Sequence, residues 1–261
     1  MFAEEEAGLL LASGVSGAEL EAMIARRVEG EPLEYILGWA RFCGLRIRVA
    51  EGVFVPRQRS ALLVAEAASA IATLPAREDH PPRVLDLCCG TGALGAAVHA
   101  RVNGAGRSIE VWASDLDPVA AACARDNLGL GADRVFSGDL FEPLPEALRG
   151  TLDIILCNTP YVPTGVIGML PPEARNHEPL AALDGGTDGL DVQRSVAADA
   201  RHWLTPGGTL FVETSAGQAP ATAEIFARNG LESRIIADEH RGATVVSGRS
   251  RARAARSQVF S

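Results

Sequence analysis

No run of 18 consecutive apolar residues occurs in this 261-residue sequence, which argues against a membrane-spanning helix. The N-terminal stretch MFAEEEAGLLLASG is acidic and its apolar run is short, so it does not have the pattern of a secretory signal. Internal repeats are absent too, and nothing in the sequence indicates an oligomeric state. We therefore expect a cytoplasmic protein with no membrane partner, built as one large domain or as one domain with a small appendage.

Cysteine pairs at the spacing of a metal site are also missing. The five cysteines are scattered, and most of them lie inside apolar runs: Cys43, Cys88, Cys89, Cys123 and Cys157. The adjacent pair Cys88 and Cys89 does not have the spacing of zinc ligands. We interpret the cysteines as small buried hydrophobic residues in a reducing compartment, and we expect no bound metal.

Positive charge is in deficit. The chain has 24 Lys and Arg against 33 Asp and Glu, which gives a net charge of −9. Affinity for nucleic acid comes largely from Lys and Arg that neutralise phosphates, so the composition disfavours a nucleic-acid partner. The cationic residues gather only at the C-terminus, where we expect residues 251–261 to form a flexible, solvated, Arg-rich tail.

The first 55 residues are predicted to form a short helical segment followed by a β-hairpin, a candidate for substrate recognition. Residues 3–30 have a helical pattern, with Ser16 as an N-cap within it and Gly30 at its end. The stretch RFCGLRIRVAEGVFVP alternates around Glu51 and Gly52, which predicts a hairpin that turns at these two residues.

Residues 56–250 are predicted to form one α/β domain. A helix capped by Ser60 and the polar hinge LPAREDHPP come first, and short β-rich runs then alternate with helical ones. This alternation is typical of a Rossmann-like, doubly wound fold with a mostly parallel sheet of about seven strands and helices on both faces. Ligands of such sheets bind at the carboxyl ends of the strands, so the residues after each strand are the candidates for a site.

A glycine-rich turn follows the first strand of this domain. The stretch DLCCGTGALG runs from Asp86 to Gly95, and Gly90 and Gly92 permit a tight turn with close backbone approach to a ligand. A P-loop is excluded because no Lys-Ser/Thr follows. Gly95 completes a G-x-G-x-x-G spacing, so nicotinamide dinucleotide binding remains an alternative on this motif alone.

Acidic residues follow the next two strands. Asp115 can accept hydrogen bonds from a ribose diol, whereas Asp117 suits the N-cap of a helix that begins at Pro118. Asp139 can accept a hydrogen bond from an exocyclic amine, with the N–H of Leu140 beside it. Three such turns in chain order favour a ligand that contains a nucleoside.

The fourth strand ends abruptly in LDIILCNTPYVP, at Asn158, Thr159, Pro160 and Tyr161. A planar nitrogen with two N–H groups needs two fixed acceptors, which the Asn158 side chain and the Thr159 carbonyl could supply. Pro160 would keep the corner rigid and Tyr161 would pack on the planar group. The alternative is an Asn-initiated turn in which proline merely stops the strand.

Together these motifs resemble the class I S-adenosylmethionine-dependent methyltransferases and, more closely, the HemK/PrmC-type protein-(glutamine-N5) methyltransferases. The resemblance is carried by GEPLEYILGWARFCGLRIRV, VFVPRQRSALLV, VLDLCCGTGALG, GDLFEPL, NTPYVP, HEPLAALDGGTDGLD and PGGTLFVETS. It implies S-adenosylmethionine as the cofactor. The implied cofactor contacts are Asp86, Cys88, Gly90, Gly92, Asp115 for the ribose, Leu116, Asp139 for the adenine, Leu140 and Asn158. The implied catalytic residues are Asn158, Thr159, Pro160 and Tyr161.

Two departures from the family pattern are typical of a divergent branch. Thr159 replaces the second residue of the Asn-Pro-Pro-Tyr motif, and PRPETE becomes PRQRSA, with Arg59 and Ala61 at acidic positions. The part before GEPLEY is about 30 residues, which is short beside the helical domain with which such enzymes grip a release factor.

The resemblance implies a protein partner with a glutamine side chain, such as a translation factor. The alternatives are a small-molecule N-methyltransferase and an adenine-N6 methyltransferase of nucleic acid.

The stretch RNHEPLAALDGGTDGLD is predicted to form a polar loop over the site, with Asp188 or Asp191 capping the next helix. His177 in this loop suits a structural hydrogen bond better than a proton acceptor. Glu213 and Gln218, after the fifth strand, are candidate substrate contacts.

Overall fold

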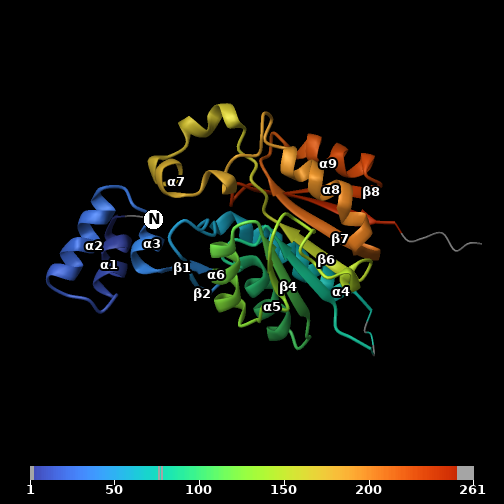
Figure 1. Ribbon diagram of the computed structural model, residues 1–261, viewed down its shortest axis with the longest axis horizontal. Helices are drawn as coiled ribbons and strands as arrows, with labels where there is room; N and C mark the ends of the chain where they lie inside the picture. The colour runs from blue at the N-terminus through green and yellow to red at the C-terminus, as the bar shows by residue number, and fades with distance from the viewer. Residues whose placement is uncertain (1–2, 76, 78, 252–261) are drawn as a thin grey trace, which may run out of the picture.

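The computed structural model describes residues 3–75, 77 and 79–251, and the arrangement of its elements is shown in Figure 1. The helices are α1 (Ala3–Leu11), α2 (Ala18–Val28), α3 (Leu33–Leu37), α4 (Ala61–Thr73), α5 (Ala93–Gly104), α6 (Pro118–Leu128), α7 (Pro172–His177), α8 (Asp191–Trp203) and α9 (Ala219–Arg228). The strands are β1 (Trp39–Phe42), β2 (Leu45–Arg48), β3 (Arg83–Leu87), β4 (Glu110–Asp115), β5 (Val135–Ser137), β6 (Leu152–Cys157), β7 (Leu204–Thr214), β8 (Leu231–Asp238) and β9 (Ala243–Ser250).

A seven-stranded, mostly parallel sheet forms the centre of the molecule and confirms the predicted fold class. Its order is β5-β4-β3-β6-β7-β9-β8, and β9 is antiparallel to both of its neighbours. The order reverses beside β3. The chain adds β4 and β5 on one side of β3 and then crosses to β6 on the other side. This switch point brings the carboxyl ends of β3, β4 and β6 to one edge, which is where a ligand is expected.

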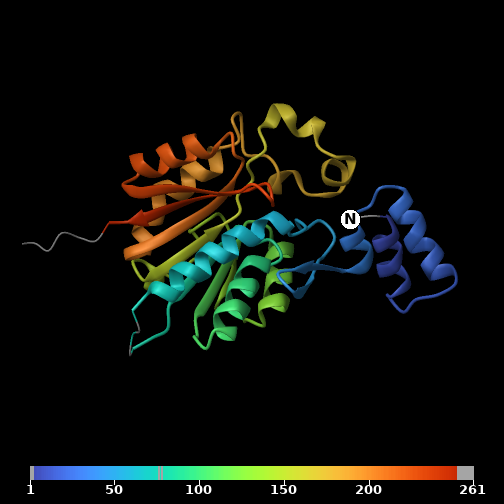
Figure 2. The same cartoon turned by 180° about the vertical axis from the view of Figure 1, so that it is seen from behind.

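Helices cover both faces of the sheet because its strands are apolar on both sides. Ile155 and Cys157 of β6 pack in the cluster that contains α8 and α9, whereas Ile154 and Leu156 pack in the cluster that contains α4 and α5. Figures 1 and 2 show these two helical layers from opposite sides, with α6 next to α5. Burial on both faces explains why β6 reads as a continuous hydrophobic run.

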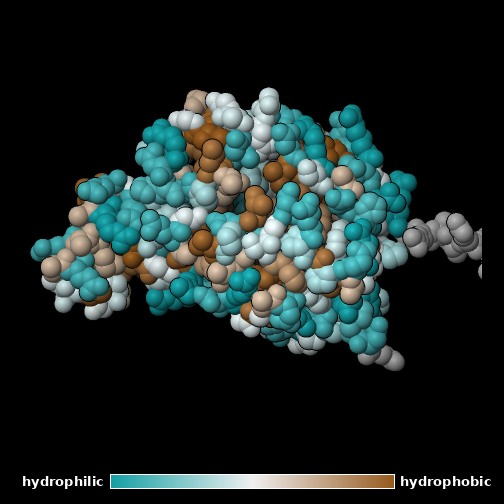
Figure 3. Space-filling view, in the orientation of Figure 1, coloured by the Kyte–Doolittle hydropathy of each residue, from teal (hydrophilic) through white to brown (hydrophobic). Residues whose placement is uncertain are grey.

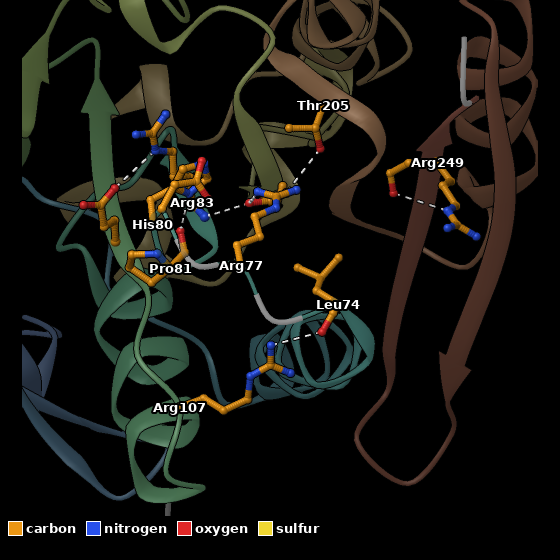
Figure 4. Close-up of polar contacts among 12 residues, drawn as sticks. Leu74, Arg77, His80, Pro81, Arg83, Arg107, Thr205 and Arg249 are labelled. Atoms are coloured by element: carbon orange, nitrogen blue, oxygen red, sulfur yellow. Dashed lines mark hydrogen bonds and ion pairs between the residues drawn. The ribbon is translucent and has the colours of Figure 1, made fainter. Parts of the chain in front are cut away.

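The amino end of β6 is fastened to the hinge between α4 and β3. The buried carboxylate of Asp153 accepts two hydrogen bonds from Arg77, at 2.9 and 2.7 Å, and one from the Arg83 N–H at 2.9 Å. Thr205 donates a further bond at 3.2 Å. Figure 4 shows Arg77, Arg83 and Thr205 close together at this end of the sheet. The polar hinge expected from the sequence is thus tied to the core by charge.

The N-terminal segment stands away from the sheet, at the left of Figure 1, and the β1–β2 hairpin joins it to the rest. The expected turn at Glu51 and Gly52 is wrong. The hairpin turns at Cys43 and Gly44, which both have positive φ (49° and 81°), as a tight two-residue turn requires. Cys43 is therefore exposed and not a buried hydrophobic residue. The division at residue 55 stays a prediction.

The predicted helix caps hold only in part. Asp117 caps α6, since its Oδ1 accepts a hydrogen bond from the Val119 N–H at 2.8 Å. The N-cap of α2 is Gly17 and not Ser16, and Ser60 precedes α4 without a side-chain capping bond. Residues 252–261 of the predicted tail lie outside the described residues.

Candidate active site

A cavity of about 750 Å³ lies at the carboxyl ends of β3, β4 and β6. One part is lined by the turns that follow β3, β4 and β5, and another by the corner after β6. Pro32 and Glu34 of the N-terminal segment and Glu173 of α7 line it as well. The turns predicted to bind a nucleoside and the corner predicted to hold an acceptor nitrogen therefore share one cavity.

The glycine-rich turn after β3 is shaped by backbone conformations that favour glycine. Gly90 has a φ of 53° and lines the cavity, and Cys88, which also lines it, adopts a φ of 55° that is rare for a residue with a side chain. A Cβ on Gly92 would approach the Cβ of Ala124 to 3.0 Å, because α6 packs against the turn. Gly92 thus shapes the turn from behind and does not line the cavity.

Asp86, predicted as a cofactor contact, lies beneath this turn, is fully buried and does not line the cavity. Its Oδ2 accepts a hydrogen bond from the Gly95 N–H at 2.8 Å, whereas its Oδ1 has no partner among the described residues. Burial raises the pKa of Asp86 to about 8, since desolvation outweighs the bond from Gly95. A cationic group brought to this carboxylate would favour its ionised form.

Asp115 links the first two turns. Its Oδ2 accepts a hydrogen bond from the Gly90 N–H at 2.7 Å, and its Oδ1 accepts one from the Asp117 N–H at 2.9 Å. Asp115, which was predicted to bind the ribose, therefore also stabilises the two turns. From the sequence we expected such a structural role only for Asp117. Burial raises the pKa of Asp115 despite these bonds.

The turn after β5 brings Asp139 and Leu140 to the same cavity. Leu140 has a φ of 44°, and its carbonyl accepts a hydrogen bond from the Ser114 hydroxyl at 3.1 Å. Leu116 also lines the cavity and is 62% exposed, which leaves an apolar side chain beside the three carboxylates Asp115, Asp117 and Asp139. Strained backbone at Cys88 and Leu140 is typical of ligand-binding turns.

The corner after β6 leaves two acceptors available. The side chain of Asn158 is half-buried, lines the cavity and makes no hydrogen bond to any other described residue. No hydrogen bond within the described chain uses the Thr159 carbonyl either. Thr159 itself is only 2% exposed, and its hydroxyl has no partner among the described residues.

Three side chains from distant parts of the sequence hold Tyr161. Its hydroxyl accepts a hydrogen bond from Arg59 Nη2 at 2.5 Å and donates one to Glu213 Oε1 at 3.3 Å. Gln218 donates to the Tyr161 carbonyl at 2.9 Å. Burial raises the pKa of the Tyr161 hydroxyl to about 12, with a contribution from the charge of Glu213. Glu213 and Gln218, expected as substrate contacts, thus lie behind the corner and support it.

A second buried glutamate lines the cavity. Glu178, whose side chain is 1% exposed, accepts hydrogen bonds from Arg57 Nη2 at 2.5 Å and from the Val55 N–H at 3.3 Å. Burial raises the pKa of Glu178, although Arg57 opposes the shift. Neither this pair nor the pair of Arg59 and Glu213 follows from sequence spacing, although the unusual PRQRSA stretch drew attention to Arg59.

The segment between Val162 and Leu190 covers the corner. Gly185, Gly186 and Gly189 are constrained, and a Cβ on Gly189 would come within 2.3 Å of the Tyr161 carbonyl oxygen. Asp188 accepts a hydrogen bond from the Leu190 N–H at 3.1 Å, just before α8, although the N-cap residue is Leu190. His177 ends α7 and does not line the cavity, so the structure does not place it as a proton acceptor.

The described residues contain no group of His, Cys, Asp and Glu side chains arranged to hold a metal ion. Within the same ranges, no helix combines the length and the apolar character needed to cross a bilayer.

Comparison with known proteins places this site in context. Residues 49–167 match the family model described as "Methyltransferase small domain". The chain is 39% identical, over 89% of its length and 78% of the relative's, to the release factor glutamine methyltransferase of Geobacter sulfurreducens. It is 35% identical, over 79% of its length and 69% of the relative's, to the 4-amino-L-phenylalanine/4-methylamino-L-phenylalanine methyltransferase of Streptomyces pristinaespiralis. A methyltransferase crystal structure from Pyrococcus furiosus has the same fold, with a TM-score of 0.51 at 14% identity, over 90% of this chain and all of the other.

Proposed function

The chain belongs to the release factor glutamine methyltransferase family and is an S-adenosylmethionine-dependent methyltransferase, and we propose that it methylates the side-chain amide nitrogen of a glutamine in a protein. The relatives' printed name makes a release factor the first acceptor to test. The single observation that carries the proposal is the corner after β6: Asn158 and Thr159 line a cavity shared with the turns after β3, β4 and β5, and neither the Asn158 side chain nor the Thr159 carbonyl has a hydrogen-bond partner among the described residues.

The described residues fit the cofactor. Asp115 and Asp139 would hold its ribose and adenine, Leu116 would cover the base, and Asp86 beneath the glycine-rich turn would favour its positively charged methionine part. The unpartnered Oδ1 of Asp86 is the observation that supports this fit, because an orphaned buried carboxylate oxygen attracts a cation. When bound, S-adenosylmethionine supplies an electrophilic methyl group on a sulfonium.

The protein's task is to prepare a poor nucleophile. An amide nitrogen delocalises its lone pair into the carbonyl, so it must be held close to the methyl carbon and turned toward it. Asn158 Oδ1 and the Thr159 carbonyl accept its two N–H groups, and Tyr161 packs on the amide plane. Acceptors fixed in advance also stabilise the positive charge that develops on the nitrogen. No strong base is needed, since the proton can leave after the transfer.

A small-molecule amine is the second candidate acceptor. The corner recognises a planar nitrogen with two N–H groups, which an arylamine also presents, and one relative is named for methylation of 4-amino-L-phenylalanine. An adenine amine in nucleic acid has the same geometry, but the net charge of −9 disfavours a polyphosphate acceptor.

The direct test offers the purified chain labelled S-adenosylmethionine with a release factor, with 4-amino-L-phenylalanine, and with a cell lysate. We expect label on the release factor and a mass increase of one methyl group on a glutamine side chain. Label on 4-amino-L-phenylalanine alone would transfer the assignment to the second candidate. Label on nucleic acid would overturn both.

A further inference from the structure

We propose that Arg57 and Arg59 form a carboxylate-recognition site in the cavity, through which the enzyme selects acceptors that carry an anionic group close to the target nitrogen. Arg59 is the principal residue of this site because it lies beside Tyr161. The inference rests on the proposed function only in that the target nitrogen binds at the corner after β6.

Both arginines are arranged as the exposed ends of ion pairs with buried carboxylates. The side chains of Arg57 and Arg59 are 35% and 42% exposed, whereas those of their partners Glu178 and Glu213 are each 1% exposed. Arg57, Arg59 and Glu178 line the cavity, whereas Glu213 does not. The pair of Arg59 and Glu213 is therefore a dipole whose positive end lies at the cavity and whose negative end lies in the core.

The guanidinium groups are held in place but keep donors available. Arg57 lies over Phe54, with 5.1 Å from its Cζ to the ring centroid, and Arg59 lies over Tyr161 at 5.8 Å. The hydrogen bonds to described residues use Nη2 of Arg57 and Nε and Nη2 of Arg59, which leaves Nη1 of both without a partner there. A planar guanidinium that is already fixed loses little entropy when it binds a carboxylate.

Acidic residues also line this cavity and decide which arginine dominates. Glu173 is ion-paired with Arg27 at 2.6 Å, so its charge is balanced. Glu34 and Glu178 line the cavity on the side of Arg57, and Glu178 is the ion-pair partner of Arg57. The carboxylates Asp115, Asp117 and Asp139 belong to the turns of the cofactor part. Arg59, fixed against Tyr161, is thus the cation that an acceptor at the corner meets.

Charge at this position discriminates between acceptors. A carboxylate near the target amide gains charge-assisted hydrogen bonds from Arg59, a neutral acceptor leaves the Nη1 donors unused, and a cationic acceptor is repelled. Two sources offer the same chemistry. One is an acidic residue next to glutamine in a polypeptide, and the other is the α-carboxylate of a free amino acid.

The test uses three blocked peptides that differ only in the residue after glutamine, which is Asp, Asn or Lys, together with free L-glutamine and L-glutaminamide. Binding is measured by calorimetry in the presence of S-adenosylhomocysteine, and transfer is measured as kcat/KM with S-adenosylmethionine. We expect the Asp peptide to bind about tenfold or more tightly than the Asn peptide, the scale of one charge-assisted hydrogen bond, and the Lys peptide to bind least. Preference for L-glutamine over its amide, without a preference among peptides, would identify the free amino acid as the source.

Variants assign the preference to Arg59. Arg59→Gln combined with Glu213→Gln removes both ends of the dipole and leaves no unpaired buried charge, so the fold should survive, and thermal unfolding checks this. We expect the variant to lose the preference and Arg59→Lys to retain part of it. Arg228→Gln, which removes an exposed ion pair with Glu224 on α9, should change nothing.

Equal binding of the charged and neutral probes, or a preference that persists in the double variant, would overturn the proposal. Absence of binding by every probe would overturn it as well. Failure of the proposed function would give a different result, namely cofactor binding without methyl transfer to any glutamine. The two results can be told apart because the preference for the Asp peptide is measured by binding alone.

Discussion

Three aspartates near the site differ in what surrounds them: Asp86 lies in β3, Asp115 ends β4 and Asp117 follows it. Asp117 caps α6, Asp115 accepts two backbone hydrogen bonds, and the buried Asp86 has one oxygen without a partner among the described residues. Local structure fully explains Asp117 and explains Asp115 only in part. Asp86 is the one whose protonation should change when a cationic ligand arrives.

Asp86 should make the ligand-free protein less stable as the pH rises. Its pKa is about 8 when folded and about 4 when unfolded, so between these values the folded state holds a proton that the unfolded state has lost. The contribution of Asp86 to the free energy of unfolding is therefore largest below pH 4. It falls between pH 4 and pH 8, by at most about 1.4 kcal/mol per pH unit. Urea unfolding at several pH values measures the slope, and Asp86→Asn should reduce it.

The same carboxyl should release its proton when S-adenosylmethionine binds near pH 6.5. Calorimetry in buffers of different ionisation enthalpy would detect the release, and Asp86→Asn should abolish it. A slope and a proton count that Asp86→Asn leaves unchanged would show that another group, such as Asp115, titrates instead.

Asn158 should matter for turnover far more than Thr159. Asn158→Ala removes one of two acceptors fixed for the target nitrogen, so we expect kcat to fall by a factor of about 100 or more, with little change in cofactor affinity. Thr159→Ala keeps the carbonyl and should have a mild effect, and Thr159→Pro should preserve or raise activity. If Thr159→Ala is inactive while Asn158→Ala is active, the buried Thr159 hydroxyl carries the chemistry and the two-acceptor mechanism is wrong.

At the residue scale, local features could be predicted from sequence and distant ones could not. The cap at Asp117 depends on Pro118 and on an N–H two residues away. Glu213 and Gln218 support Tyr161 from 52 and 57 residues further along the chain, and no spacing rule links them. Both were expected to touch the substrate because strand ends attract functional residues, whereas the folded chain uses them to hold the corner.

At the scale of elements, turns were harder to place than strands. β1 and β2 have four residues each, and Gly44 and Gly52 both adopt positive φ, so either glycine could have closed the hairpin. The register pairs Phe42 with Leu45, which leaves room for a two-residue turn only. The end of β6 was predicted correctly, because its hydrophobic run stops at Cys157, directly before the polar corner.

Gly189 is the element-scale position where a side chain cannot be accommodated. A Cβ there would lie 2.3 Å from the Tyr161 carbonyl oxygen and 2.4 Å from Gln218 Nε2, and the φ of 77° is itself unfavourable for alanine. We expect Gly189→Ala to destabilise the protein by about 1–3 kcal/mol and to impair turnover by displacing Tyr161. Gly150→Ala is the matched control, since Gly150 has a φ of 72° and no described atom beyond its chain neighbours lies within 4 Å of its Cβ position. Equal thermal stability of the two variants would refute the packing argument.

At the scale of the whole molecule, the alternation of strands and helices was enough to predict a doubly wound sheet. The placement of the N-terminal segment was not, because it depends on a few charged side chains from distant parts of the sequence. Arg27 of α2 bonds Glu6 of α1 at 2.7 Å and Glu173 of α7 at 2.6 Å. Figure 3 shows apolar surface over the segment that precedes α7, where Val166 and Met169 are 42% and 83% exposed. The N-terminal segment and α7 thus border the cavity together.

Arg27 should therefore affect a polypeptide acceptor more than the cofactor. Partly exposed ion pairs contribute about 0.2–1 kcal/mol each, so Arg27→Gln should raise the KM for a protein acceptor by up to about fivefold per pair and leave the Kd of S-adenosylmethionine unchanged. Added salt should produce the same trend in the parent protein, because the pair with Glu173 is half-exposed. Arg26→Gln is the control, since both of its hydrogen bonds go to Glu31 within the N-terminal segment. If Arg26→Gln has the same effect, loss of positive charge and not the link to α7 determines acceptor affinity.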